Sequence, residues 1–342
     1  MLLTIIERSI TLKNPKTLKT LNLPKQRTSA QIDRIELDLV DYCNIQCPGC
    51  PTPQGKTKLD WDKIKPHIEY IATKNKIVDI TICGNGGEPS LHPRITEIII
   101  DLSLIFPTTL ITLATNGEDF RYLNLDLLDD MYKTLLIEFS VDGHTQELHQ
   151  ITRVGGNLEK VIKNINASLK HRIDTVVYTT RHKANEEYVD DIYNFIKKET
   201  TLETQFRDTT RVVPDQNLLH PTKKSENGNV TVLNPSYKFQ PSFSQLETIY
   251  GITPNFNFYF NPDGRVYPCA AFYYNNFLIP NLNAYDMTPE AWYNEFNNFS
   301  TEYCNYHRAN IFCDWKRCCL ECGVDNTFKF DNYNEIKELH QK

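Results

Sequence analysis

Long hydrophobic runs are absent from this sequence of 342 residues, and no segment reaches the length of a membrane span. The short apolar start, MLLTII, has no basic region before it and no small-residue cleavage site after it, so no secretory signal is indicated. A surplus of positive charge is also missing. The formal net charge of −6 argues against nucleic acid or an anionic membrane as the partner. These absences predict a cytoplasmic protein.

Several familiar catalytic motifs are lacking as well, since no Ser/His/Asp triad, Walker loop or paired-carboxylate site is evident. Cysteine, by contrast, is plentiful, with ten residues. A reducing cytoplasm keeps thiols free, so metal ligands are favoured over disulfides. The cysteines form an early group, a late group and an isolated residue that we expect to be a small core side chain: Cys43, Cys47 and Cys50; Cys269, Cys304, Cys313, Cys318, Cys319 and Cys322; and Cys83.

Short β-rich runs alternate with segments of helical periodicity over the first two thirds of the chain. The predicted strands are 32–40, 77–85, 109–117, 135–143, 174–182 and 204–213, and the predicted helices are 60–74, 94–106, 124–133, 157–172 and 186–199. Repeated strand–helix units predict parallel strands with right-handed crossovers, in a doubly wound sheet or a partial (β/α)6 barrel. Both folds bind ligands at the carboxyl ends of their strands, where the early cysteines lie.

The composition divides the chain into four parts. Residues 1–31 form an N-terminal extension, and residues 32–213 form the predicted barrel. Residues 214–255 are rich in Pro, Asn, Ser and Lys and read as a linker. Residues 256–342 begin with a predicted hairpin around NPDG, include one helix at about 288–297, and carry the late cysteines.

The early cysteines have the spacing CNIQCPGC. Three thiolates can hold three irons of a four-iron cubane and leave the fourth iron open to a substrate or cofactor. The alternatives are a zinc site completed by a distant residue, or simply buried cysteines. The second predicted strand ends in GNGGEP, where paired glycines allow a small molecule to approach the backbone. The two loops would share one mouth of the barrel.

Taken in order, these motifs resemble the radical S-adenosylmethionine (SAM) superfamily. CNIQCPGC matches its CxxxCxxC motif and GGEP its second motif, and the resemblance continues through ATNG at 114–117 and FSVDGHTQELHQITRVGGNLEKVIKNI at 139–165. The last segment is similar to the fourth-strand region of those members that carry a C-terminal SPASM or twitch extension. The resemblance implies a radical SAM partial barrel followed by a twitch/SPASM-like iron–sulfur extension.

The resemblance also implies roles for particular residues. Cys43, Cys47 and Cys50 would ligate a [4Fe–4S] cluster whose open iron is chelated by SAM. The remaining candidates are the backbone of Gly86, Gly87 and Glu88 for the methionine amino group, Ser140 and Asp142 near the ribose, Arg153 for the SAM carboxylate, and Asn116 in the pocket. One departure concerns Gly49, where the family usually has an aromatic residue, so the adenine contact is expected from Tyr42 or from the backbone after Cys50.

The late cysteines predict an auxiliary site. NPDGRVYPC resembles the start of a twitch or SPASM segment, with Gly264 and Cys269 in the matching places. Six thiols are too few for two fully cysteine-ligated cubanes, which favours one second [4Fe–4S] cluster. Its expected ligands are Cys269, Cys313, Cys319 and Cys322, with Cys304 and Cys318 as alternatives. Zinc competes here because a CxxC pair binds it equally well.

The predicted function is therefore that of a radical SAM enzyme. In such enzymes a reduced cluster cleaves SAM, and the 5′-deoxyadenosyl radical removes a hydrogen atom from the substrate. A peptide or protein side chain is slightly favoured as the substrate over oxidation or rearrangement of a small molecule, and the expected electron donor is a flavodoxin or ferredoxin. Arg181, His182, Arg207 and Asp208 are candidate substrate contacts. The alternative from another class is a non-catalytic, zinc-stabilised interaction protein.

Overall fold

A computed structural model describes the backbone of three short strands near the N-terminus and, in the rest of the chain, residues 32–48, 50, 55–83, 87–131, 134–208, 256–267 and 282–298. The three N-terminal strands, β1 (Thr4–Ile6), β2 (Ser9–Thr11) and β3 (Thr20–Asn22), pair antiparallel with one another. The sequence patterns did not predict them.

The main sheet has eight strands in the order β11-β10-β4-β5-β6-β7-β8-β9. Its strands are β4 (Ile32–Asp38), β5 (Asp79–Cys83), β6 (Leu110–Thr115), β7 (Leu135–Ser140), β8 (Asp174–Arg181), β9 (Thr204–Asp208), β10 (Phe256–Phe260) and β11 (Val266–Tyr267). From β4 to β9 all neighbours are parallel and follow chain order. This order confirms the predicted strand–helix repeat.

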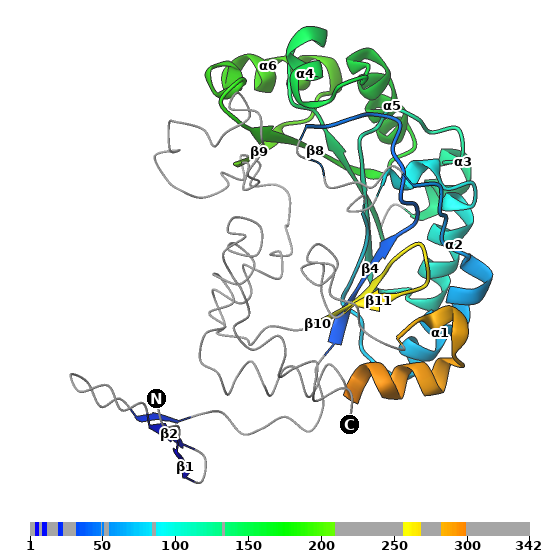
Figure 1. Cartoon of the computed structure of the whole chain (residues 1–342). Helices are drawn as coiled ribbons and strands as arrows, with labels where there is room; N and C mark the ends of the chain where they lie inside the picture. Colours follow the sequence, from blue (N-terminus) through cyan, green and yellow to red (C-terminus); the bar gives the residue numbers. More distant parts are fainter. Residues whose placement is uncertain are drawn as a thin grey trace.

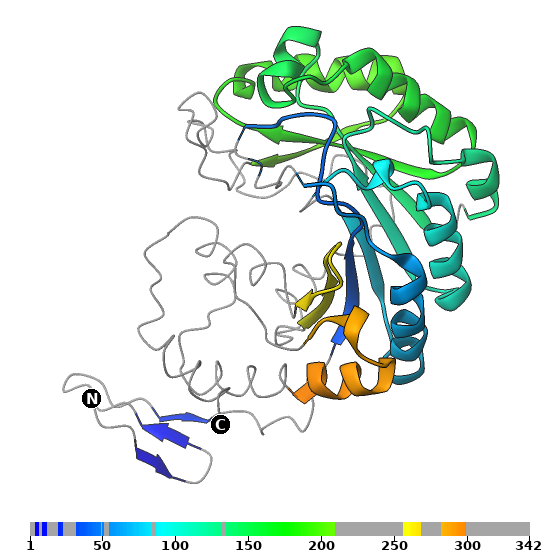
Figure 2. The same ribbon diagram turned by 45° about the vertical axis from the view of Figure 1, so that its right-hand side comes forward.

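Helices connect these strands and cover one face of the sheet. They are α1 (Trp61–Lys74), α2 (Ile95–Ile105), α3 (Leu125–Leu128), α4 (Gln146–Thr152), α5 (Leu158–Lys170) and α6 (Val189–Thr200). Figures 1 and 2 show that the sheet curves, with the helices on its convex side. Asn157 caps α5 as predicted, since its side chain accepts a hydrogen bond from the backbone N–H of Lys160. The predicted helix 124–133 is shorter, and α4 was not predicted.

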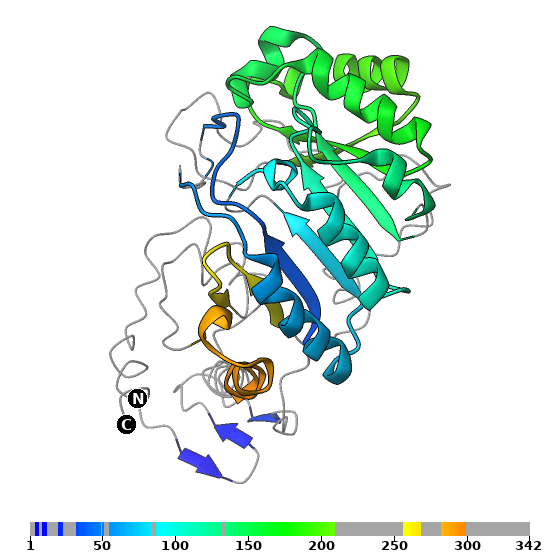
Figure 3. The same cartoon turned by 90° about the vertical axis from the view of Figure 1, so that its right-hand side faces the viewer.

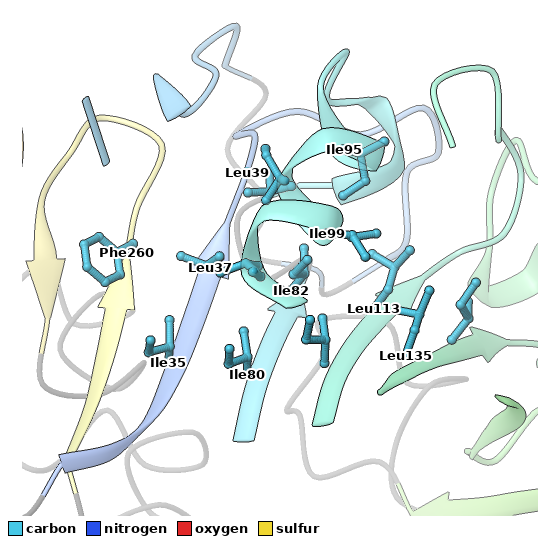
Figure 4. Close-up of a cluster of buried hydrophobic side chains, with 14 of the residues drawn as sticks. Ile35, Leu37, Leu39, Ile80, Ile82, Ile95, Ile99, Leu113, Leu135 and Phe260 are labelled. Carbon is cyan, nitrogen blue, oxygen red and sulfur yellow. The ribbon is translucent and has the colours of Figure 1, made fainter. Parts of the chain in front are cut away.

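The hydrophobic core lies between the sheet and these helices. Alternate strand residues point into it, among them Ile35 and Leu37 of β4 and Ile80 and Ile82 of β5, all fully buried (Figure 4). The residues between them face the concave side and are mostly polar, as in Arg34, Glu36 and Asp38 of β4. Because of this alternation, one set of side chains packs against the helices, and the other set lies on the concave face, where it can contact a ligand.

The predicted NPDG hairpin consists of β10 and β11, which pair antiparallel around a turn in which Gly264 has φ +84°. Its first strand does more than form a hairpin, because β10 also pairs parallel with β4. The hairpin thereby extends the main sheet beside the strand that precedes the early cysteines (Figure 3). Residues 289–298 are helical and bring Trp292 and Phe296 against Phe258 of β10.

Within the described segments, no helix is both long enough and apolar enough to cross a membrane.

Candidate functional site

The early cysteines lie in the loop that leaves the carboxyl end of β4. Two isolated antiparallel β-bridges hold this loop. Val40 pairs with Lys58, and Gln46 pairs with Val154, which follows α4. The N–H of Cys50 donates to the carbonyl of Cys47 at 3.0 Å, which turns the chain between the second and third thiols. All three cysteines are partly buried. The loop is thus anchored at both flanks, with its thiols at the mouth of the half-barrel.

Burial makes the thiols of Cys43 and Cys47 reluctant to ionise unaided. It raises the pKa of Cys43 to about 11, and the charges of Glu88, Cys47 and Cys50 add to the effect. Burial also raises the pKa of Cys47, while the nearby Arg153 guanidinium opposes the rise. The mutual influence of the three thiols places them in one small region. A bound metal would supply the positive charge that stabilises the thiolates.

One metal ion and an iron–sulfur cluster require different arrangements of cysteine ligands. Among the described residues, no three His, Cys, Asp or Glu side chains converge as a single metal ion requires. A cubane makes no such demand, since each of its cysteine thiolates binds a different iron. Three neighbouring thiols in one anchored loop therefore fit a [4Fe–4S] cluster with one open iron.

The GGEP loop after β5 makes close backbone contact with the cysteine loop. Gly86 lies outside the described residues, whereas Gly87 abuts the segment between β4 and Cys43. A Cβ atom at Gly87 would stand 2.4 Å from the carbonyl oxygen of Val40 and 2.5 Å from that of Tyr42. The N–H of Glu88 donates to the same Tyr42 oxygen at 2.9 Å. The paired glycines were expected to let a small molecule approach the backbone. At Gly87, the group that approaches is instead the backbone of Val40 and Tyr42.

The Glu88 carboxylate joins this loop to the end of β6. It is buried and accepts hydrogen bonds from Thr115 Oγ1 at 2.6 Å, from the N–H of Asn116 at 2.8 Å and from the N–H of Ser90 at 3.1 Å. Burial raises the pKa of Glu88, although these hydrogen bonds oppose the rise. Sequence reasoning assigned only the backbone of Glu88. The GGEP and ATNG motifs after adjacent strands were the signal that could have indicated the contact.

Asn116 connects β6 to the cysteine loop. Its Nδ2 donates to Asn44 Oδ1 at 2.9 Å and lies 3.5 Å from Cys43 Sγ. Its Oδ1 accepts a hydrogen bond from the N–H of Glu118 at 2.9 Å. The predicted pocket residue therefore contacts a candidate cluster ligand.

The buried Asp142 and the partly buried Arg153 form an ion pair beside the second cysteine. Arg153 Nε donates to Asp142 Oδ2 at 2.8 Å, and Arg153 Nη1 lies 4.0 Å from Cys47 Sγ. The same carboxylate accepts from Thr152 Oγ1 at 3.0 Å and from the N–H of Thr180 at 2.8 Å. Although burial alone would raise the pKa of Asp142, Arg153 and the Thr180 N–H hold it below the usual range. Asp142 thus orients Arg153 toward the cysteine loop.

The other predicted pocket and substrate residues are spread along neighbouring strand ends. Ser140 ends β7, is partly buried, and pairs in register with Tyr178 of β8. Arg181 ends β8, and His182 follows it with a buried ring and a pKa that burial lowers. Arg207 and Asp208 end β9, where they pair with Thr180 and Arg181. These residues share one edge of the sheet.

Cys83 does not belong to the hydrophobic core, so that expectation was wrong. It ends β5 on the concave face, and its Sγ lies 3.4 Å from Asp38 Oδ1. The hydroxyl of Tyr259, from β10, donates to the other oxygen of Asp38, which is fully buried. Strand alternation places Cys83 opposite in direction to Ile82. This polar cluster was not predicted.

The predicted auxiliary site lies outside the described residues. This holds for all of its candidate ligands, Cys269, Cys304, Cys313, Cys318, Cys319 and Cys322, and also for Gly49 in the cysteine loop.

Comparisons with known proteins agree with the fold. A family model described as the radical SAM superfamily matches residues 38–196. The GTP 3′,8-cyclase of Clostridium botulinum is 26% identical over 178 residues, 49% of this chain and 54% of that protein. The enzyme of the same name from Listeria monocytogenes is 30% identical over 151 residues, 42% of this chain and 44% of that protein. The chain therefore spans about half the length of the curated relatives it matches.

Solved structures share the architecture over more of the chain. Streptococcus suis SuiB bound to SAM superposes with a TM-score of 0.57 and 13% identity, covering 77% of this chain and 66% of that one. The enzyme anSMEcpe with bound SAM superposes with a TM-score of 0.53 and 18% identity, covering 84% of this chain and 88% of that one. At such identities the likeness concerns the fold.

The curved parallel sheet and its outer helices define a partial (β/α) barrel. Residues 38–196 match the radical SAM superfamily model, so this part of the chain is a radical SAM domain, a domain found in enzymes. A radical SAM domain implies a [4Fe–4S] cluster and SAM as cofactors.

Proposed function

We propose that Cys43, Cys47 and Cys50 hold a [4Fe–4S] cluster, at which SAM is reductively cleaved so that a hydrogen atom can be taken from a substrate. The carrying observation is the anchored loop of three neighbouring thiols beside the partly buried Arg153 guanidinium. When bound, the cluster supplies the electron that cleaves SAM, and the 5′-deoxyadenosyl fragment removes the hydrogen atom. The protein contributes binding, orientation and exclusion of water.

Arg153 is the proposed ligand of the SAM carboxylate. Its Nε is already engaged by Asp142, and its Nη1 lies 4.0 Å from Cys47 Sγ. A guanidinium held in this way can offer a two-pronged contact to a carboxylate. Asp142 then acts mainly as the residue that fixes Arg153, because its carboxylate already accepts three hydrogen bonds from the protein.

The remaining proposed SAM contacts come from the ends of three strands of the sheet or from the loops that follow them. Ser140, at the end of β7, is the proposed ribose contact. The backbone of Gly86, Gly87 and Glu88 is proposed to receive the methionine amino group. Tyr42 is the proposed adenine contact in place of an aromatic residue at Gly49.

The C-terminal region is proposed to bind a second [4Fe–4S] cluster through Cys269, Cys313, Cys319 and Cys322, as a twitch or SPASM-like extension. A flavodoxin or ferredoxin is the proposed electron donor. A cytoplasmic location belongs to the same proposal, because exposed cysteine thiolates and iron–sulfur clusters need protection from oxidation.

A peptide or protein side chain remains the favoured substrate. One structure with the same fold is that of anSMEcpe with bound SAM and a Cp18Cys peptide, and it covers 84% of this chain at a TM-score of 0.52. The second candidate is a small molecule, supported by the similarity to GTP 3′,8-cyclases. That similarity spans about half of each protein, so the peptide is preferred on the wider coverage of the fold.

The proposal is tested on protein purified and reconstituted without oxygen. We expect iron and sulfide in the wild type and dithionite-dependent formation of 5′-deoxyadenosine from SAM. Cys47→Ala should abolish this product. Cys83→Ala is the matched control, because it removes a thiol that lies outside the cysteine loop and should leave the product in place. Zinc in place of iron, with SAM intact in every reaction, would support the zinc-stabilised interaction protein instead.

The substrate class needs a separate measurement. Extract from cells grown in heavy water can be offered to the reconstituted enzyme, and deuterium transfer into 5′-deoxyadenosine followed by mass spectrometry. If the substrate is a peptide, prior treatment of the extract with protease should abolish the transfer. Transfer that survives protease, or conversion of added GTP, would favour the small-molecule candidate.

A further inference from the structure

The amide of Asn116 has a fixed orientation. Its Oδ1 accepts the N–H of Glu118 at 2.9 Å, so the NH2 end must face the cysteine loop. The backbone of the residue is held too, because its own N–H donates to the buried Glu88 carboxylate at 2.8 Å. Asn116 is 6% exposed. Neither the amide nor the backbone can turn away without breaking a hydrogen bond in a region with little access to water.

The NH2 group carries two hydrogens and has two acceptors in reach. Asn44 Oδ1 lies at 2.9 Å and Cys43 Sγ at 3.5 Å. One hydrogen can therefore serve Asn44 while the other points at the sulfur. Asn44 presents its Oδ1 to Cys43, as an acceptor for the thiol at 3.7 Å, and this oxygen has no hydrogen to offer a thiolate.

We propose that Asn116 donates an N–H···S hydrogen bond to the Cys43 thiolate in the loaded protein, and thereby positions this ligand and raises the reduction potential of the cluster. This proposal rests on the proposed function of the cysteine loop. It makes Asn116 a positioning residue that acts through Cys43, rather than a direct contact of SAM.

The direction of the effect follows from charge. Reduction adds an electron to a cluster whose sulfurs share the negative charge, and a hydrogen bond to a ligand sulfur stabilises the more negative state. Asn116 is buried, at 6% exposure, so water does not readily take the place of its amide when the donor is removed. The easier the reduction, the more readily a biological donor can supply the electron.

The test is an anaerobic redox titration of the reconstituted protein, followed by the paramagnetic resonance signal of the reduced cluster. Asn116→Ala should lower the midpoint potential, and the reduction equilibrium should fall by up to about tenfold, which is about 59 mV for one electron. Asn116→Asp keeps the size and the acceptor for Glu118 but adds negative charge, so it should lower the potential further. It also provides a second variant if the alanine protein loads poorly.

Asn164→Ala is the matched control. The Nδ2 of Asn164 donates to the carbonyl of Gly117 at 2.7 Å, so this change loosens the turn beside Asn116 without touching a cysteine. Its midpoint potential should equal that of the wild type. If all three variants shift equally, loop loosening explains the result and the inference is overturned.

The two proposals fail differently. A wild-type protein that binds no iron, or that binds iron but leaves SAM intact, overturns the proposed function and with it this inference. A wild type that cleaves SAM, together with an Asn116→Ala variant of unchanged potential, overturns only the role of Asn116.

Discussion

The contact between the GGEP loop and the cysteine loop makes Gly87→Ala a demanding test of the site geometry. The added Cβ would stand 2.4 Å from the carbonyl oxygen of Val40, 2.5 Å from that of Tyr42 and 2.8 Å from the Tyr42 nitrogen. All three are backbone atoms, so no side chain can rotate to relieve the clash. The two loops must separate, and the separation reaches Cys43 through its neighbour.

The cost can be estimated from two contributions. Forcing one methyl group into a packed region costs about 1–3 kcal/mol. Separation of the loops also weakens the hydrogen bond from the N–H of Glu88 to Tyr42, at 2.9 Å, which is worth about 1 kcal/mol. We therefore expect a loss of about 2–4 kcal/mol in the free energy of unfolding, within the roughly 5–15 kcal/mol of an ordinary domain. The variant should fold and bind iron poorly.

The assay combines urea denaturation of the protein without iron, followed by circular dichroism, with iron per chain after reconstitution. Gly155→Ala is the matched control. Gly155 has φ +87°, and a Cβ atom added there would meet nothing within 4 Å, so alanine costs only about 1–2 kcal/mol of backbone strain. The control should lose some stability and retain its iron.

Equal stability and equal iron content in Gly87→Ala and the wild type would refute the reasoning. Such a result would mean that the two loops do not approach as closely as the structure describes. If Gly155→Ala lost as much iron as Gly87→Ala, the loss of iron would be explained by general destabilisation and not by the contact at Gly87.

Three further perturbations have expected outcomes. Asp142→Asn removes one partner of a buried ion pair and leaves Arg153 uncompensated, so urea denaturation should show a loss of about 3–5 kcal/mol. Unchanged stability would mean that water reaches the guanidinium. Tyr259→Phe deletes a hydrogen bond to the fully buried carboxylate of Asp38 and should cost about 1–3 kcal/mol in the same assay, whereas a neutral result would show that another donor replaces the hydroxyl. Burial lowers the pKa of His67, so the folded protein binds fewer protons than the unfolded chain, and stability should fall as the pH drops below about 6.5, by at most about 1.4 kcal/mol per pH unit from this residue. His67→Leu should make the denaturation midpoint less dependent on pH between 7 and 5, and an identical dependence would contradict the assignment.

Local patterns were sufficient for the barrel strands and for the cysteine loop. Apolar residues alternate along β4 because one face of each strand packs against helices, and this period can be read without tertiary contacts. The CxxxCxxC spacing and the GGEP motif each lie within a few residues, so their positions after β4 and β5 follow once the strands are known. The N-cap at Asn157 is a local signal of the same kind.

Contacts between distant residues could not be predicted in this way. The joining of β10 to β4 depends on the pairing of Tyr259 with Glu36, and the hydrogen bond from Tyr259 to Asp38 spans 221 residues of chain. The direction of Cys83 depends on the register of β5, since a shift of one residue would have turned it into the core. No short-range pattern contains this information.

The sequence alone thus determined the class of the protein, because the spacing of three thiols and the alternation of strands and helices are local properties of the chain. Only the tertiary structure decided how the site is held together. The Glu88 carboxylate spans 28 residues to reach the N–H of Asn116, and Arg153 spans 106 residues to approach Cys47. Hydrogen bonds are short and directional, so these contacts form only where the folded sheet brings its strand ends together.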